Sequence, residues 1–179
     1  MKILAIVVNH NGKKLLQKSM PSLISTYHPS LDICVVDNNS SDNSITFLEK
    51  EYPEVKIIKS KKNLGYGRAH NLAIKKYSDY HYYIFMNNDL KLEPDWLDRL
   101  LEVIQMKKNV GAVGPKILLS KKKEDRYVIN SAGLEIDDHY MAYDRFVGKH
   151  DDQKYSIIEK VDGICGAVML VSKEVLEKI

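Results

Sequence analysis

Short apolar runs alternate with longer amphipathic segments along the first hundred residues. Residues 3–8 form a continuous apolar run, which is typical of a strand buried on both faces. Residues 13–27 carry apolar side chains at helical spacing around Pro21, where we expect a kink or a break because proline lacks the N–H. The same patterns predict strands at 31–36, 55–59 and 82–86, and helices that run from a cap at Ser41 or a neighbour to about Lys50, over 65–77, and onward from Pro94.

Strands and helices alternate regularly in this half, so we expect a mostly parallel sheet with helices on both faces. The carboxyl ends of parallel strands meet at one edge of such a sheet, and ligands bind there. Each informative polar cluster in this half directly follows a predicted strand. The pattern therefore predicts an α/β protein with a binding site at that edge.

The second half of the chain is less regular. Residues 111–119 predict one or two strands around Pro115, and 134–136 and 167–171 predict two more. Ser172 is placed to cap a closing helix at 173–179. Residues 120–126 (SKKKEDR) indicate a solvated loop rather than a nucleic-acid site.

The composition is that of a folded globular protein, with 44% hydrophobic and 28% charged residues. The length suits a single domain over residues 1–179, and a net charge of +3 is too small to indicate nucleic acid as a partner. Cys34 and Cys165 lie far apart in apolar runs, so we expect buried free thiols in a reducing cytosol. We see no run near the ~20 apolar residues that span a bilayer and no signal-peptide pattern, and so expect a cytoplasmic protein.

Asp37 follows the second predicted strand and opens the turn-rich segment 37–42 (DNNSSD). A carboxylate there can accept a hydrogen bond from a nucleobase N–H, and an acid in a comparable place binds ribose hydroxyls in nicotinamide folds. The alternative is a turn in which Asp37 and the two asparagines satisfy the backbone themselves. The segment alone leaves both interpretations open.

A glycine-containing loop at 63–71 (NLGYGRAHN) leads into the third predicted helix. Gly65 and Gly67 permit close backbone approach, a helix amino terminus favours phosphate, and Arg68 can pair with a diphosphate. The alternative is an ordinary loop with an exposed arginine. The spacing does not match G-x-G-x-x-G, which disfavours a dinucleotide site.

Asn87, Asn88 and Asp89 follow the fourth predicted strand. A hard divalent cation prefers oxygen ligands, often one or two carboxylates plus substrate phosphates. Asp89 offers the carboxylate and the two amides can support it, whereas the segment alone favours an Asx turn leading to Pro94. The six histidines show no metal-ligand spacing, and no nucleophile-elbow motif occurs.

Taken together and in order, these segments resemble the family 2 inverting glycosyltransferases, with their nucleotide-binding GT-A fold. The resemblance covers nearly all of the chain, and its NND and GAVML segments are most similar to the rhamnosyltransferase-like branch. It rests on VVNHN at 7–11, VVDN at 35–38 with Ser40 and Asp42, NLG at 63–65 with Asn71, NND at 87–89 with PDWL at 94–97, and Asp162 with GAVML at 166–170.

The resemblance implies a Rossmann-like three-layer α/β/α sandwich, with a nucleotide-binding half at 1–97 and the start of an acceptor-side half at 98–179. It implies that Asp37 binds the donor's base beside the backbone of Val8 and Asn9, and that Arg68 lies near the diphosphate. Asp89 would hold a Mg²⁺ or Mn²⁺ ion that bridges the phosphates, and residues 166 and 167 would line the sugar and acceptor side. The expected binding residues are Val8, Asn9, Asp37, Asn39, Asn63, Gly65, Arg68, Asn71, Asn87, Asn88, Gly166 and Ala167.

The implied reaction is a single displacement at the anomeric carbon of a nucleoside-diphosphate sugar (dTDP, UDP or GDP), with inversion. The metal neutralises the departing diphosphate, and a carboxylate base removes the proton of the acceptor hydroxyl. The rhamnosyl resemblance favours dTDP. The acceptor would be a saccharide or a lipid-linked saccharide, and the latter would bring the protein to the inner face of the membrane.

Two departures from the family pattern change what we expect of this chain. The acidic triplet of the wider fold is Asn-Asn-Asp here, which leaves one carboxylate for the metal. The Glu-Asp pair that carries the base is expected beyond Ile179, so we expect a truncated chain. The alternative function is therefore a nucleotide-sugar-binding module or scaffold without chemistry. A nucleotidyltransferase is more distant, because residues 9–14 do not fit its glycine-rich basic signature.

Overall fold

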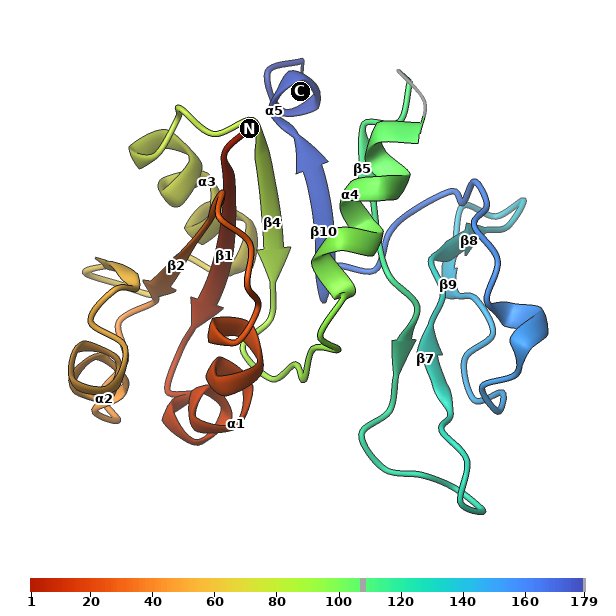
Figure 1. Cartoon of the computed structure of the whole chain (residues 1–179), viewed down its shortest axis with the longest axis horizontal. Helices are drawn as coiled ribbons and strands as arrows, with labels where there is room; N and C mark the ends of the chain where they lie inside the picture. Colours follow the sequence, from red (N-terminus) through yellow and green to blue (C-terminus); the bar gives the residue numbers. More distant parts are fainter. Residues whose placement is uncertain (107–108, 179) are drawn as a thin grey trace.

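The computed structural model describes residues 1–106 and 109–178, which form a six-stranded mixed sheet with helices around it and a more extended second half (Figure 1). The strand order in the sheet is β3-β2-β1-β4-β10-β5. Four neighbouring strands are parallel, whereas β10 is antiparallel to both β4 and β5. The strands are β1 (Ile3–Asn9), β2 (Leu31–Asp37), β3 (Lys56–Lys59), β4 (Tyr82–Met86), β5 (Ala112–Val113) and β10 (Val168–Ser172).

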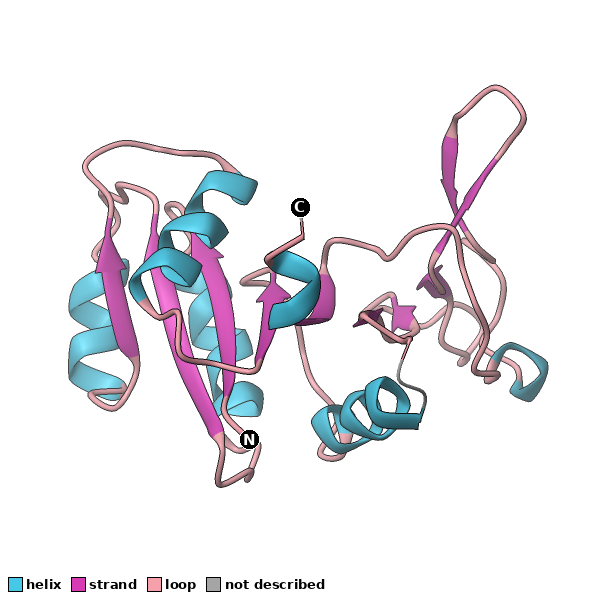
Figure 2. Ribbon diagram, turned by 90° about the horizontal axis from the view of Figure 1, so that it is seen from above, coloured by secondary structure: helices cyan, strands magenta, loops and turns pink. Residues whose placement is uncertain are grey.

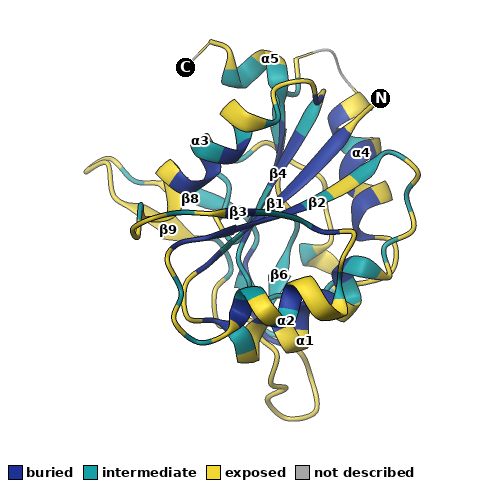
Figure 3. Ribbon diagram, turned by 90° about the vertical axis from the view of Figure 1, so that its left-hand side faces the viewer, coloured by how far each residue is buried: buried dark blue, intermediate teal, exposed yellow. Residues whose placement is uncertain are grey.

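Helices cover both faces of this sheet, as Figures 2 and 3 show. Side chains alternate between the faces along β1: Ile3, Ala5 and Val7 pack in one core, and Leu4 and Ile6 in the other. The first core contains side chains of α1 (Lys13–Ile24), α2 (Ser44–Glu51) and α4 (Trp96–Met106). The second contains α3 (Tyr66–Lys76) and, packed against it, Leu176 of α5 (Lys173–Leu176). The predicted three-layer sandwich is confirmed.

The second half adds two small antiparallel ribbons beside the sheet (Figure 1). β6 (Ile117–Leu118) pairs with β7 (Ile129–Ser131), and β8 (Leu134–Ile136) pairs with β9 (Ala142–Asp144). A short 3₁₀ helix, η1 (Gln153–Tyr155), follows. The sequence predicted β8 but not β7, β9 or η1. Elements of two or three residues are too short to show a period, so such predictions rest on local composition alone.

Several predicted boundaries differ from the structure. α1 continues through Pro21 and ends at Ile24, so the expected break does not occur: Met20 and Leu23 are buried on either side and hold both turns against the core. The residue before α2 is Asn43, at φ 61°, and not Ser41 itself, which we named first as the cap. α4 begins two residues after Pro94, and α5 ends at Leu176; Ile179 lies outside the described residues.

The two cysteines differ in burial. Both are free, as expected, and burial raises the pKa of the Cys34 thiol to about 12. Cys165, in contrast, is only half-buried, which corrects the prediction that both thiols are enclosed. It lies in the segment before β10, outside the apolar run that forms the strand. Among residues 1–106 and 109–178, no helix has the length and apolar character needed to cross a bilayer.

Candidate functional site

The carboxyl ends of β1, β2 and β4 meet at one edge of the sheet, and the antiparallel β10 begins at the same edge. Backbone hydrogen bonds join these segments: the Asn38 N–H donates to the Asn9 carbonyl at 2.7 Å, and the Asn87 N–H donates to the Ala167 carbonyl at 3.0 Å. The structure thus brings together clusters near both ends of the chain, from Asn9 to Ala167.

The Asn9 side chain connects three of these segments. It is fully buried, and its Nδ2 donates to Asp37 Oδ1 at 3.1 Å and to Ser40 Oγ at 3.2 Å. Its Oδ1 accepts from Asn88 Nδ2 at 2.8 Å. Because a buried amide left without partners would be costly, this network fixes Asn9, Asp37 and Asn88 in one arrangement.

Asp37 is 3% exposed, and the structure surrounds its carboxylate with protein donors. Oδ1 accepts from Asn9, and Oδ2 accepts from the Ser40 N–H at 2.9 Å, as the turn interpretation requires. A carboxylate offers about four acceptor positions. Both oxygens therefore retain lone pairs, and the turn does not preclude a contact with a ligand.

Asn38 links the end of β2 to the glycine-containing loop. Its Oδ1 accepts from the Leu64 N–H at 3.3 Å, and its Nδ2 donates to the Gly65 carbonyl at 3.1 Å. Asn63 Oδ1 accepts from the Gly65 N–H at 2.8 Å, and Gly65 adopts φ +75°, which a residue with a side chain rarely adopts. This loop places the amino terminus of α3 at the carboxyl edge of the sheet.

The remaining predicted residues of this half are more open. Asn39, Asn63, Arg68 and Asn71 are exposed, and Arg68 makes no ion pair with an acid among the described residues. Val8 and Asn87 are half-buried. The exposed polar groups therefore lie on the solvent side of the buried network around Asn9.

Asp89 is exposed beside this network, and its carboxylate forms no hydrogen bond or ion pair within residues 1–106 and 109–178. The Asn88 carbonyl accepts from Ser19 Oγ at 2.9 Å, which ties the residue before Asp89 to α1. Among the described residues, no group of three or more His, Cys, Asp or Glu side chains is arranged to hold a metal ion. One carboxylate fits a cation that takes its other ligands from a phosphate-bearing substrate.

The sequence did not predict an aromatic stack at this edge. The ring of His70, 2% exposed, lies 4.3 Å from Tyr66 and 4.8 Å from Phe85 of β4, centroid to centroid. Its Nδ1 lies 3.0 Å from the Tyr66 carbonyl oxygen and its Nε2 3.3 Å from that of Ile6. Burial lowers the pKa of His70. The sequence feature that could have predicted the stack is the spacing of Tyr66 and His70, which lie four positions apart on a predicted helix and so share one face.

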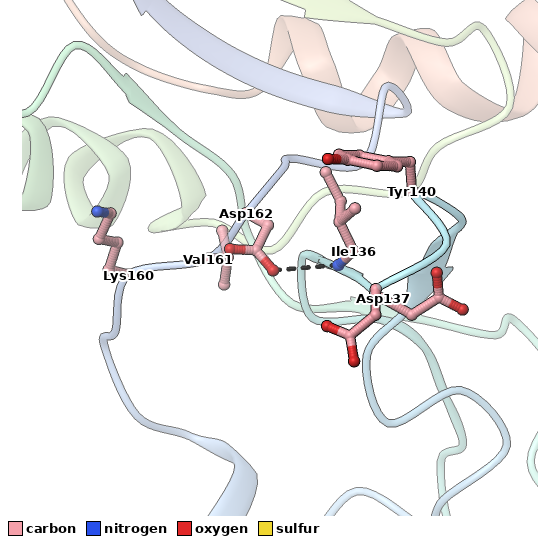
Figure 4. Close-up of a pocket in the computed structure, with 7 residues that line it drawn as sticks. Ile136, Asp137, Tyr140, Lys160, Val161 and Asp162 are labelled. Carbon is pink, nitrogen blue, oxygen red and sulfur yellow. Dashed lines mark hydrogen bonds between the residues drawn. The ribbon is translucent and has the colours of Figure 1, made fainter.

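A hollow of about 600 Å³ lies in the second half of the chain, and no residue of the sheet edge described above lines it (Figure 4). Asp162, part of the sequence resemblance, lies in it and accepts a hydrogen bond from the Ile136 N–H at 3.0 Å. That bond ties residue 162 to β8. The lining residues are Ile136, Asp137, Asp138, Tyr140, Lys160, Val161 and Asp162, none of which is a predicted site residue except by that motif.

Comparison with known proteins gives the context of this edge. The family model described as "Glycosyl transferase family 2" matches residues 4–179. A mannosyltransferase of Pyrobaculum calidifontis, solved in complex with GDP-Man and Mn²⁺, superposes with a TM-score of 0.66 over 99% of this chain and 46% of that chain. At 17% identity this similarity shows the fold, and it confirms the predicted GT-A architecture.

Several curated proteins are similar to the chain in sequence, including the following two. It is 26% identical over 122 residues to an uncharacterized glycosyltransferase of Haemophilus influenzae, covering 66% of this chain and 38% of that protein. It is 25% identical over 122 residues to the N-acetylglucosaminyl-diphospho-decaprenol L-rhamnosyltransferase of Mycobacterium tuberculosis, covering 63% of this chain and 40% of that protein. These matches thus span well under half the length of either relative.

Proposed function

We propose that this chain, which belongs to glycosyl transferase family 2, binds a nucleoside-diphosphate sugar at the carboxyl edge of its sheet and acts in sugar transfer. One observation carries the proposal. The hydrogen-bonded network of the buried Asn9 and Asp37 with the half-buried Asn88 lies at the edge where β10 begins and where the glycine loop and Asp89 lie. Ligands of open α/β sheets bind at this edge.

The base of the donor would lie against the ends of β1 and β2. Asp37 retains acceptor lone pairs after its bonds to Asn9 and Ser40, and these suit the ring N–H of uracil, thymine or guanine. The backbone of Val8 and Asn9, with Asn39, would complete this side of the site. The buried network keeps Asp37 in place before the ligand arrives, which reduces the entropy lost on binding.

The diphosphate would lie at the amino terminus of α3. The unpaired N–H groups of a helix's first turn favour anions, and the Asn38 bonds to residues 64 and 65 fix the loop that leads there. Arg68 projects from this turn without an acidic partner among the described residues and can pair with phosphate oxygens. Asn63 and Gly65 lie on the loop before α3, and Asn71 lies in the second turn of the helix.

Asp89, with Asn87 beside it, is the residue that would hold a Mg²⁺ or Mn²⁺ ion. Bound there, the ion would neutralise charge that grows on the departing nucleoside diphosphate. The mannosyltransferase of similar fold contains Mn²⁺ with its donor, which supports this part of the proposal.

The proposed reaction transfers the sugar with inversion to a saccharide or lipid-linked acceptor. Gly166 and Ala167 would line the sugar side, because the antiparallel β10 starts at the binding edge. The match to a rhamnosyltransferase that acts on a decaprenol-linked saccharide supports a dTDP sugar and a lipid-linked acceptor. The match to the family supports transfer rather than nucleotide binding alone.

Thermal unfolding with UDP, dTDP, GDP and NAD, each with and without Mn²⁺, tests the proposal. A ligand at a hundred times its dissociation constant adds about 2.7 kcal/mol to the free energy of unfolding, which raises the melting temperature measurably. We expect a Mn²⁺-dependent rise with one of the three nucleoside diphosphates and none with NAD. An unchanged melting temperature with all four nucleotides would overturn the proposal.

A further inference from the structure

A side-chain hydrogen bond joins α3 to the segment that precedes β10. The Tyr66 hydroxyl donates to the Gly166 carbonyl at 2.5 Å, across 100 positions of sequence. Side chains of an α-helix tilt toward its amino terminus, so a tyrosine at the first helical position projects past the start of the helix. The phenol therefore reaches from the loop at 63–65 to the opposite side of the binding edge.

The ring of Tyr66 is held in this direction by its neighbours. The ring of His70, one turn later on α3, lies 4.3 Å from that of Tyr66 and 4.8 Å from that of Phe85 of β4, centroid to centroid. Burial raises the pKa of Tyr66 to about 12, with a contribution from Cys165, so the phenol keeps its proton and remains a donor at neutral pH. Tyr66 remains 39% exposed, so the contact with His70 and the hydroxyl bond together orient the ring.

The segment 163–167 is fastened at its two ends by backbone bonds. At one end the Gly163 carbonyl accepts from the Leu134 N–H of β8 at 2.8 Å. At the other end the Ala167 carbonyl accepts from the Asn87 N–H at 3.0 Å. Gly166 is exposed between them, and a side chain added there would meet no atom within 4 Å. Tyr66 supplies a third attachment, from a side chain, at this open point.

We propose that Tyr66 is a positioning residue, which fixes the Gly166 carbonyl and so sets the placement of segment 163–167 against the sugar end of the donor. The placement of the sugar rests on the proposed function, whereas the attachment itself is a property of the chain alone. The hydroxyl acts through Gly166 and not on the reacting atoms. It therefore contributes to recognition of the sugar and leaves recognition of the nucleoside diphosphate unchanged.

Tyr66→Phe tests this, because it removes the hydroxyl and keeps the ring against His70. Tyr83→Phe is the matched control: it also removes a bond from a tyrosine to a backbone carbonyl, that of Tyr77 at 2.8 Å, at the far end of α3. The first readout is amide hydrogen exchange over residues 161–169 without ligand. In Tyr66→Phe we expect about fivefold faster exchange there, because the loss of one hydrogen bond destabilises the closed segment by about that factor. In Tyr83→Phe we expect wild-type exchange.

The second readout is affinity for UDP-GlcNAc, GDP-mannose and dTDP-rhamnose, each against its free nucleoside diphosphate. In Tyr66→Phe we expect about fivefold weaker binding of the sugar conjugate and less than twofold change for the nucleoside diphosphate. Exchange over 161–169 equal to wild type would overturn the attachment, and equal weakening of both ligands would overturn the role in sugar recognition. If the wild type binds no nucleotide, the proposed function fails, while the exchange result still decides whether Tyr66 positions the segment.

Discussion

The Oδ1 atom of Asn9 accepts a hydrogen bond of 2.8 Å from Nδ2 of Asn88, 79 positions later in the chain. The bond crosses from the end of β1 to the loop after β4 and passes close to Gly12. An added Cβ at Gly12 would lie 2.3 Å from Asn88 Nδ2 and 2.4 Å from Asn9 Oδ1. The absence of a side chain at residue 12 is therefore a condition for the buried network.

Gly12→Ala should lower the free energy of unfolding by about 1–3 kcal/mol, because the methyl group must displace one of the two bonded amides. Denaturant unfolding measures this directly. Gly67→Ala is the control: a Cβ there meets no atom within 4 Å, and alanine in a helix should be neutral or stabilising by up to about 1 kcal/mol. Equal stability of the two variants would contradict the steric argument.

Asp37→Ala should weaken binding of the preferred nucleoside diphosphate by about tenfold or more, since a hydrogen bond to a charged group is lost. Calorimetric titration measures the affinity, with circular dichroism to verify the fold. Asp32→Ala, near the amino end of the same strand, should bind like the wild type. Unchanged affinity in a folded Asp37→Ala would remove this carboxylate from the site and leave it a purely structural role in the turn.

Asp89→Asn should abolish the Mn²⁺ dependence of donor binding, because an amide is a far weaker ligand for a hard cation than a carboxylate. The measurement is the melting temperature with nucleoside diphosphate, with and without Mn²⁺. Asp98→Asn, an exposed acid in the first turn of α4, is the matched control and should retain the dependence. Retained dependence in Asp89→Asn would locate the ion elsewhere.

His70 should make stability fall as the pH drops below about 6.5, the ordinary value for histidine. Burial outweighs the two carbonyl contacts and lowers the pKa of the folded state, so the unfolded state takes up the proton first. Above that pH both states are neutral and the residue contributes no pH dependence. The loss is at most about 1.4 kcal/mol per pH unit for one proton.

Chemical unfolding of wild type and His70→Phe at pH 7, 6 and 5 measures this effect. We expect a flatter profile for the variant, whatever its stability at pH 7, since its side chain binds no proton. Parallel profiles for wild type and His70→Phe would show that His70 titrates alike in both states.

The sequence alone determined the first half of the fold. Residues 3–8 and 82–86 are apolar runs of β-forming residues, and 65–77 has helical spacing, so local periodicity located β1, β4 and α3 to within one residue. The polar clusters that begin at Asp37 and Asn87 were visible because each interrupts the apolar pattern at the carboxyl end of a strand. These are local properties, and a few consecutive residues suffice to show them.

Tertiary structure alone decided which groups are buried together. No local pattern shows that β10 runs antiparallel between β4 and β5. This direction nevertheless brings Gly166 to the edge of the sheet where the Tyr66 hydroxyl lies. Nor does the sequence show that Asn9 meets Asn88, or that Asp37 lies at 3% exposure rather than open to solvent. The reason is physical: hydrogen bonds between residues 79 or 100 positions apart depend on the packing of the whole sheet, which periodicity over a few turns does not encode.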